Sequence, residues 1–357
     1  MVSIPLGSLL ACTIVIGSWV SGPLILVTWT AILLSISRDL FGFFVVPAYL
    51  IMFKLPSRYL RVAWWIALTA FSAASSSLRL GYAVTVWVIG LPVLLDFKMP
   101  SWPGYLHFMD GRLGFKRYFR GCALRGSLEK VQQERTVFAF HPHGATSIGF
   151  TVNGLFDEAF VRRSAKLTWV IDEFLRYGNP IFRIFCDLYG TDSREIGCAS
   201  KHCMNQAMSE GRNIGLILGG FEEASVCERG KDRAVVQSRK GIIKYCLKYG
   251  YRIHPVYTFG EDETYRFAGG FTELRLKLNA CKIPTVAFFG NPLLFFLPRP
   301  EATVLTYVGD PIQCPKLDDP SKEDVDKWHK VYVDALVSLF EAKKAEAGRP
   351  DAVLELF

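Results

Sequence analysis

The sequence lacks several patterns that mark common protein classes. Its nine cysteines include no Cys-x-x-Cys pair, which argues against a disulfide framework and indicates a reducing compartment. Neither a Gly-x-Gly-x-x-Gly fingerprint nor a P-loop is present, and the absence of Gly-x-Ser-x-Gly weakens a serine hydrolase. The formal net charge is +8, but no basic run is interleaved with aromatic residues, so we expect no nucleic acid partner. A basic chain of this kind instead favours anionic headgroups or polyanionic substrates.

Charge is scarce in the first quarter of the chain. Residues 4–37 hold no charged side chain, and this run exceeds the about 20 residues that one bilayer crossing needs. Two further apolar runs, 62–78 and 81–95, follow a basic cluster of the kind that stays cytoplasmic: Lys54, Arg58 and Arg61. We therefore predict a membrane-embedded helical region over residues 1–97. Because glycine, serine and proline interrupt 4–37, the number of crossings stays open.

Residues 98–357 have the composition of a globular domain, which we expect to face the cytosol. Six apolar, β-prone runs predict strands at 136–140, 166–171, 214–218, 251–259, 285–289 and 303–308. Helical patterns lie between several of them, at 197–210 and at 242–249, where Gly250 closes the helix. Strands that alternate with helices predict an α/β fold with a mainly parallel sheet.

The clearest predicted helix lies near the end of the chain. Ser321 is a good N-cap, with Asp324 three residues on, and Gly348 and Pro350 end the pattern. An apolar stripe runs along it: Val325, Trp328, Tyr332, Ala335, Leu336, Leu339 and Phe340. We interpret this helix as packing on the sheet, with no part in chemistry.

Two histidines follow the first predicted strand. His141-Pro142-His143-Gly144 comes directly after residues 136–140. Proline fixes its own φ and glycine permits a tight turn, so the imidazoles sit at a rigid strand end, where open α/β sheets bind ligands. An imidazole held there could act as a general base. The alternatives are a turn whose histidines bond the backbone and a metal pair, but no third and fourth ligand stand at ligand spacing nearby.

A second turn combines glycines with a carboxylate. Gly219 and Gly220 follow the strand predicted at 214–218, and Glu223 comes three residues later. Two glycines let the backbone approach a substrate closely, and a carboxylate beyond them can orient an imidazole or accept a hydrogen bond from a hydroxyl. The plain alternative is an ordinary turn with exposed carboxylates.

A basic segment precedes and enters the helix predicted at 242–249. It consists of Lys231, Arg233, Arg239, Lys240 and Lys244. Guanidinium groups and helix N-termini are natural phosphate ligands. The commoner alternative for such charge is a solvated helix face.

Together these motifs resemble the type-2 diacylglycerol acyltransferase family, which includes monoacylglycerol and wax-alcohol acyltransferases. The matching pieces run in order from about Tyr118 to the end: His141-Pro142-His143-Gly144, Gly219-Gly220-x-x-Glu223-Ala224, Arg239-Lys240-Gly241-x-x-Lys244, Pro255-Val256-Tyr257-x-Phe259-Gly260-Glu261, Val308-Gly309-Asp310-Pro311-Ile312 and Glu323-Asp324-Val325-Asp326-Lys327. The chain departs from the family pattern at two positions, the first of which concerns the handling of the acceptor or acyl chain rather than the chemistry. Arg120 stands in Tyr118-Phe119-Arg120 where the family usually has proline, and Ile242 stands where it usually has phenylalanine.

The resemblance implies acyl transfer from acyl-CoA to the free hydroxyl of diacylglycerol, which forms triacylglycerol. It implies no cofactor beyond acyl-CoA as co-substrate and no metal. The partners expected are acyl-CoA, diacylglycerol and membrane lipid, and the question of a homo-oligomer is open. The location implied is the endoplasmic reticulum membrane, with multiple spans and a cytosolic catalytic domain, or the lipid droplet surface. The alternatives are a monoacylglycerol or long-chain-alcohol (wax ester) acyltransferase and, further off, a membrane lipid hydrolase or a non-catalytic lipid-binding protein.

Under this hypothesis each motif has a role. We expect His143 to be the general base because it is next to the glycine, with His141 positioning it and Glu223 orienting the base. Backbone N–H groups near Gly219 and Gly220 would stabilise the thioester oxyanion. The expected substrate-binding residues are Gly144, Gly219, Gly220, Arg239, Lys240 and Lys244, of which the last three would meet the phosphates of coenzyme A.

Overall fold

The computed structural model describes most of the chain. The described residues are 4–36, 98–267, 270–280, 288–292 and 294–357, together with positions 60, 63, 64, 66 and 67. They fall into two compact units. The larger unit comprises Met1–Ile16, Trp102–Ile171 and Tyr189–Phe357, and the smaller comprises Gly17–Ser101 and Asp172–Leu188.

An eight-stranded sheet forms the centre of the larger unit. Its order is β1-β10-β7-β2-β5-β3-β4, and β11 pairs with β7 outside this path. The strands are β1 (Gly121–Gly126), β2 (Thr136–His141), β3 (Leu167–Ile171), β4 (Arg194–Cys198), β5 (Asn213–Ile217), β7 (Arg252–Phe259), β10 (Thr303–Val308) and β11 (Ile312–Gln313). Every pairing is parallel except those of β10 and β11 with β7. The prediction of an α/β fold with a mainly parallel sheet is therefore confirmed.

Helices and two small ladders complete the described chain. The helices of the larger unit are α5 (Tyr105–His107), α6 (Glu158–Ser164), α9 (Lys201–Ser209), α10 (Gly220–Val226), α11 (Gly241–Tyr249), α12 (Thr272–Ala280) and α13 (Lys322–Lys343). Short helical turns cover Phe108–Arg112, Phe115–Tyr118, Leu128–Lys130, Gly149–Leu155 and Glu261–Glu263. Strand β6 (Asp232–Ala234) pairs with β12 (Leu354–Leu356), and β8 (Arg266–Phe267) pairs with β9 (Phe288–Phe289). Helix α1 (Leu6–Ile36) begins in the larger unit and continues in the smaller, which also holds α7 (Glu173–Gly178) and most of α8 (Pro180–Tyr189).

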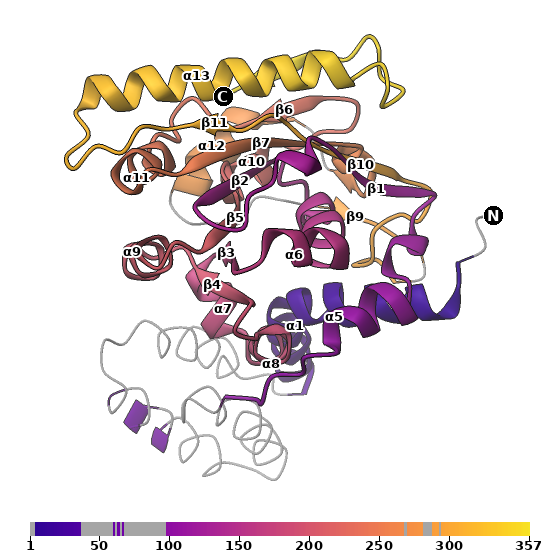
Figure 1. Ribbon diagram of the computed structural model, residues 1–357. Coiled ribbons are helices and arrows are strands. Elements are labelled where there is room, and N and C mark those ends of the chain that lie inside the picture. Colours follow the sequence, from indigo (N-terminus) through magenta and orange to yellow (C-terminus); the bar gives the residue numbers. More distant parts are fainter. Residues whose placement is uncertain are drawn as a thin grey trace. The chain divides into compact units, whose positions relative to one another are not determined.

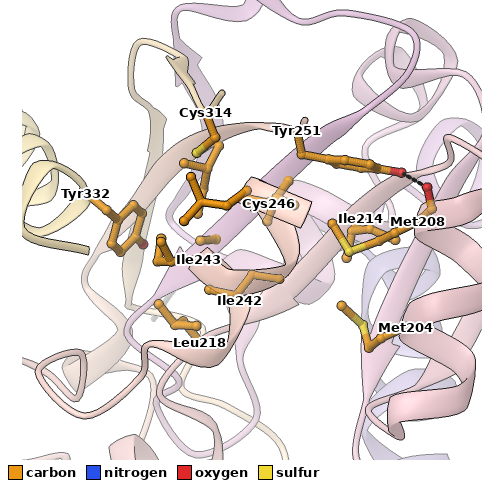
Figure 2. Packing of buried hydrophobic residues seen from close by; sticks show 14 of the residues in the cluster. Met204, Met208, Ile214, Leu218, Ile242, Ile243, Cys246, Tyr251, Cys314 and Tyr332 are labelled. Atoms are coloured by element: carbon orange, nitrogen blue, oxygen red, sulfur yellow. Dashed lines mark hydrogen bonds between the residues drawn. The ribbon is translucent and has the colours of Figure 1, made fainter. Parts of the chain in front are cut away.

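Alternate residues of β2 face opposite sides of the sheet, and both sides are covered (Figure 1). Val137 and Ala139 join a buried core with residues of α11 and with Tyr332 of α13, part of which Figure 2 shows. Phe138 points the other way, and its ring centroid lies 4.9 Å from that of Phe160 in α6. A strand buried on both faces reads as an unbroken apolar run, which is why β2 shows no alternation in the sequence.

Two predicted helix ends are confirmed. Gly250 adopts the left-handed conformation, with φ 67° and ψ 42°, directly after α11. At the start of α13, the hydroxyl oxygen of Ser321 accepts from the backbone N–H of Asp324 at 3.0 Å. The carboxylate of Asp324 accepts in return from the N–H of Ser321 at 3.1 Å. Both caps depend on residues a few positions apart, so the local sequence determines them.

Other predicted boundaries are wrong. The helix predicted at 197–210 begins only at Lys201, because the hydroxyl of Ser200 caps it by accepting from the N–H of Cys203 at 3.2 Å. The residues just before it form β4, which pairs with β3. Strand β1 was not predicted, since its sequence Gly-Cys-Ala-Leu-Arg-Gly has no β-branched or aromatic residue. Of the strand predicted at 285–289, residues 285–287 lie outside the described part, and β9 pairs with β8 rather than with the main sheet.

Most of the region predicted to be membrane-embedded lies outside the described residues, which omit 37–59 and 68–97. Among the helices that the structure does describe, none has the length and apolar content needed to cross a bilayer. The predicted boundary between residues 1–97 and 98–357 stays a prediction.

Candidate active site

His141 is the last residue of β2 and lies in a buried network of three side chains. Its Nδ1 is 2.7 Å from Oε1 of Glu223 on α10, and its Nε2 is 2.9 Å from the hydroxyl of Tyr332 on α13. The exposed fractions of His141, Glu223 and Tyr332 are 0%, 1% and 0%. Three elements that are far apart in sequence thus fix the end of β2.

The hydrogen-bond partners assign the tautomer of His141. Oε1 of Glu223 also accepts from the backbone N–H of Val235 at 2.9 Å, so we place the proton of the imidazole on Nδ1, facing the carboxylate. Burial, and next the charge of Glu223, raise the pKa of Tyr332 well above its usual value, so the hydroxyl keeps its proton and donates to Nε2. Both ring nitrogens of His141 are therefore engaged inside the protein.

His143, two residues later, is only half-buried. Its Nδ1 lies 3.0 Å from the carbonyl oxygen of Gly144 and 3.1 Å from Oγ of Ser147. A carbonyl can only accept, so Nδ1 holds the proton and Nε2 is the basic nitrogen. Burial lowers the pKa of His143 below its ordinary value, so the imidazole is neutral at pH 7 and able to take up a proton.

Two of the predicted glycines are required by close contacts. A Cβ on Gly144, where φ is +60°, would lie 2.5 Å from Oε2 of Glu261. A Cβ on Gly219 would lie 2.5 Å from the carboxyl carbon of Glu223. Gly220 differs, because a Cβ there would meet no described atom within 4 Å, while its φ of +54° favours glycine. The first two glycines therefore make room for buried carboxyls, and the third lies beside open space.

The three predicted phosphate ligands occupy different surroundings. Nη2 of Arg239 donates to the carbonyl of Gly219 at 3.3 Å and lies 2.6 Å from the carboxylate of Glu222. Nζ of Lys240 lies 2.6 Å from the carboxylate of Asp326 on α13. Lys244 is exposed on α11. Of the three, Arg239 is the one that contacts the Gly219 turn.

Sequence reasoning missed Tyr332 and Glu261 as site residues. The last helix was expected to have no part in chemistry, and the structure adds that the hydroxyl of its Tyr332 contacts His141. The sequence feature that could have indicated Tyr332 is its hydroxyl, because a tyrosine within a buried apolar stripe needs a hydrogen-bond partner. Glu261 is 1% exposed and accepts from the backbone N–H of Gly149. The sequence feature that could have indicated Glu261 is the position of its carboxylate directly after an apolar strand and a glycine.

The structure accounts for one departure from the family pattern. The backbone N–H of Arg120 donates to the carbonyl of Pro300 at 2.8 Å, and a proline at position 120 could not make this bond. The neighbouring Tyr118 is buried, and its hydroxyl donates to the carbonyl of Pro298 at 2.7 Å. Ile242 is buried in the core on α11. Both departures therefore lie in packed segments.

The described residues contain no group of three or more His, Cys, Asp or Glu side chains that could hold a metal ion. The eight cysteines that the structure describes are all free: Cys12, Cys122, Cys186, Cys198, Cys203, Cys227, Cys246 and Cys314. The predicted independence from a metal and the predicted reducing compartment stay predictions.

Comparison with known proteins identifies the family. The family model described as "Diacylglycerol acyltransferase" matches residues 112–357. Diacylglycerol O-acyltransferase 2 of Homo sapiens is 26% identical over 317 residues, covering 80% of this chain and 78% of that protein. The Xenopus laevis protein of the same name is 27% identical over 288 residues, covering 73% and 76%. Diacylglycerol O-acyltransferase 2-like protein 6 of Homo sapiens is 30% identical over 235 residues, covering 60% and 68%.

Among solved structures, the 1-acyl-sn-glycerophosphate (LPA) acyltransferase PlsC from Thermotoga maritima aligns at 15% identity, covering 80% of this chain and 98% of that one. Its TM-score of 0.38 is too low to support an argument. The matched segment of the family model, in contrast, includes both histidines of the turn, Glu223 and the whole of α13. The chain belongs to the diacylglycerol acyltransferase family.

Proposed function

We propose that this protein is a diacylglycerol O-acyltransferase, which moves a fatty acyl group from acyl-CoA to the free hydroxyl of diacylglycerol. Its family and the names of its relatives support this activity. The most direct structural support is the state of His143, a half-buried imidazole whose proton lies on Nδ1 and whose pKa is lowered. Such a group is suited to remove a proton from an alcohol.

In the proposed reaction, Nε2 of His143 takes the hydroxyl proton as the oxygen attacks the thioester carbonyl. A C–O bond forms, the tetrahedral intermediate collapses, and the C–S bond breaks. The coenzyme A thiolate then takes the proton back from His143 and leaves as the thiol. A positioned base of this kind contributes about a hundred- to ten-thousandfold to the rate.

His141, Glu223 and Tyr332 hold the turn in this mechanism and do not touch the substrate. Their hydrogen bonds join β2, α10 and α13, and all three side chains are buried. The carboxylate of Glu223 thereby orients His141 and, through the short turn, His143. The buried network keeps a single geometry because each broken bond would leave a further buried polar group unpaired.

The remaining predicted residues are proposed to bind acyl-CoA. Backbone N–H groups of the Gly219-Gly220 turn are the candidate donors to the thioester oxyanion, a role worth about 3–4 kcal/mol. Arg239, Lys240 and Lys244 are the candidate phosphate ligands. In the structure Arg239 pairs with Glu222 and Lys240 pairs with Asp326, and both carboxylates are partly exposed. A phosphate of coenzyme A could take the place of these carboxylates as the partner of each cation.

We also propose that residues 98–357 face the cytosol at the endoplasmic reticulum membrane or the lipid droplet surface. Acyl-CoA is a cytosolic substrate, whereas diacylglycerol lies in the bilayer. Large apolar side chains are exposed on the larger unit, including Phe271 at 82%, Phe295 at 49% and Leu294 at 39%, as expected where a domain touches lipid. A homo-oligomer remains an untested expectation.

An acyl-transfer assay on membranes tests the proposed function. Membranes that contain the protein receive radiolabelled acyl-CoA together with diacylglycerol, monoacylglycerol, a long-chain alcohol or no acceptor. We expect labelled triacylglycerol with diacylglycerol and none from a His143→Ala protein of equal abundance. A monoacylglycerol or wax ester product at higher rate would reassign the acceptor. Free fatty acid released equally without any acceptor would identify a hydrolase instead.

A further inference from the structure

Besides Glu223, a second buried carboxyl lies near the His-Pro-His-Gly turn, that of Glu261. Strand β7 lies next to β2, and the residue opposite His141 in the register is Tyr257. After β7 ends, Gly260 turns the chain with φ +89°, and Glu261 begins a short helical turn. Its side chain is 1% exposed, and the proposed mechanism gives it no role.

The carboxyl of Glu261 fills the inside of the loop that follows His143. Its Oε1 accepts a hydrogen bond from the backbone N–H of Gly149, and the neighbouring N–H of Ile148 is near enough to the carboxyl to favour its charged form. Oε2 is so close to Gly144 that a Cβ on this residue would lie 2.5 Å from it. Among the described residues, Oε2 has no hydrogen-bond partner. The same carboxyl group therefore touches the beginning and the end of the loop 144–149.

Ser147 connects this carboxyl to the proposed base. It adopts a φ of +51°, which is uncommon for a residue other than glycine, and its Oγ lies 3.1 Å from Nδ1 of His143. Two residues later in the chain, the N–H of Gly149 donates to Oε1 of Glu261. The conformation of Ser147 and the place of its hydroxyl are thus tied to the carboxyl of Glu261.

We propose that Glu261 is a positioning residue that fixes the loop holding His143 in its active orientation. This inference rests on the proposed function, in which His143 is the base. Glu261 acts through the backbone at 148–149 and through Ser147, and it does not contact the reacting atoms.

The charge state of Glu261 makes the proposal measurable. Burial, and less strongly the charges of Asp262 and Glu223, raise the pKa of Glu261 to about 8, so the carboxyl is neutral at pH 7. The other titratable groups that it influences are Cys122 on β1, Cys227 after α10 and Tyr265. The pKa values of these three are also raised by burial, so they stay neutral as the pH passes 8.

The test compares Glu261→Gln and Glu261→Ala with wild type, and Glu263→Gln is the matched control on the same turn. Glutamine is neutral and keeps an acceptor for the N–H of Gly149, so we expect its kcat at pH 7 within about threefold of wild type. Alanine releases the loop and should lose at least about tenfold in kcat, since a small misplacement of a base is costly. Above pH 8 the ionised carboxylate would place charge on the unpartnered Oε2 beside Gly144, so we expect wild type and the control to lose activity with an apparent pKa near 8 and Glu261→Gln to keep it.

Equal losses in the glutamine and alanine variants, or identical alkaline profiles for wild type and Glu261→Gln, would overturn the proposal. If the alanine variant does not fold, the comparison of wild type with Glu261→Gln still decides. A failure of the proposed function looks different, because wild type itself would make no acyl ester. In that case the melting temperatures of wild type and Glu261→Gln are measured as a function of pH. If the two curves coincide, Glu261 is not a buried neutral carboxyl.

Discussion

The carboxylate of Glu223 lies 2.7 Å from Nδ1 of His141, although 82 positions separate the two residues in the chain. This pair joins the Gly219-Gly220 turn to the His-Pro-His-Gly turn, and β2 and β5 run parallel beside each other just before these turns. Because the carboxyl ends of adjacent parallel strands meet at one edge of a sheet, the two motifs come together there. The pairing leaves the more exposed His143 for the proposed chemistry.

The two histidines should respond differently to alanine. We expect His143→Ala to lower acyl transfer by at least about a hundredfold at normal protein abundance, because only the proton transfer is lost. His141→Ala should lose less of the rate per folded molecule. It should, however, destabilise the protein by about 1–3 kcal/mol, since it leaves buried polar groups unpaired. Rates and melting temperatures of both variants check this, and a His143→Ala enzyme that kept most of its rate would reassign the base.

Removal of the negative charge at Glu223 should lower the rate. In Glu223→Gln the amide oxygen can still accept from Val235 and His141, but the negative charge that stabilises the imidazolium of His143 is lost. We expect kcat to fall at least about tenfold. Glu228→Gln, in a half-buried cluster with Lys231 and Arg233 beyond α10, is the control and should keep the wild-type kcat. A Glu223→Gln enzyme as fast as the control would show that the charge of Glu223 does not contribute to the rate.

The hydroxyl of Tyr332 should contribute to stability. Tyr332→Phe removes the donor to Nε2 of the buried His141 and leaves this nitrogen without a partner, at a cost of about 1–3 kcal/mol. The expected result is a lower melting temperature with a smaller effect on kcat. Tyr249→Phe, which removes a half-exposed hydroxyl bonded to Asn205, serves as the control. Equal melting temperatures for the two variants would count against the network.

The pH profile should show a base with a lowered pKa. His143 must be neutral to accept a proton, and its pKa lies below 6.5 because burial disfavours the imidazolium. The acid limb of kcat/KM should therefore have an apparent pKa below 6.5. If the acid limb of kcat/KM were centred well above pH 6.5, either another group would control the rate or the pKa of His143 would not be lowered.

Arg239 should affect binding of acyl-CoA rather than the chemical step. Removal of a phosphate contact that is made equally in ground and transition states raises KM and leaves kcat unchanged. We expect this result for Arg239→Ala, with acyl-CoA as the varied substrate. Lys231→Ala, which breaks a partly exposed ion pair with Glu228, is the control. A fall in kcat with an unchanged KM would point to a role at the Gly219 turn instead.

The sequence by itself determined the local features of this protein. The apolar run of β2, the His-Pro-His-Gly turn after it, the glycine that closes α11 and the capping box of α13 were all predicted. These features depend on backbone preference and on partners within a few residues, so the local sequence is sufficient. The alternation of strands and helices likewise predicted the parallel sheet.

Only the tertiary structure decided which side chains meet. Tyr332 lies 191 positions from His141, and a helical stripe shows that a tyrosine is buried but not which atom its hydroxyl reaches. Strands β1 and β4 form because the neighbouring strands β10 and β3 pair with them, although their own sequences are weak strand formers. Glu261 reaches the loop 144–149 because β7 lies beside β2. Such contacts depend on strand order, which no local sequence pattern encodes.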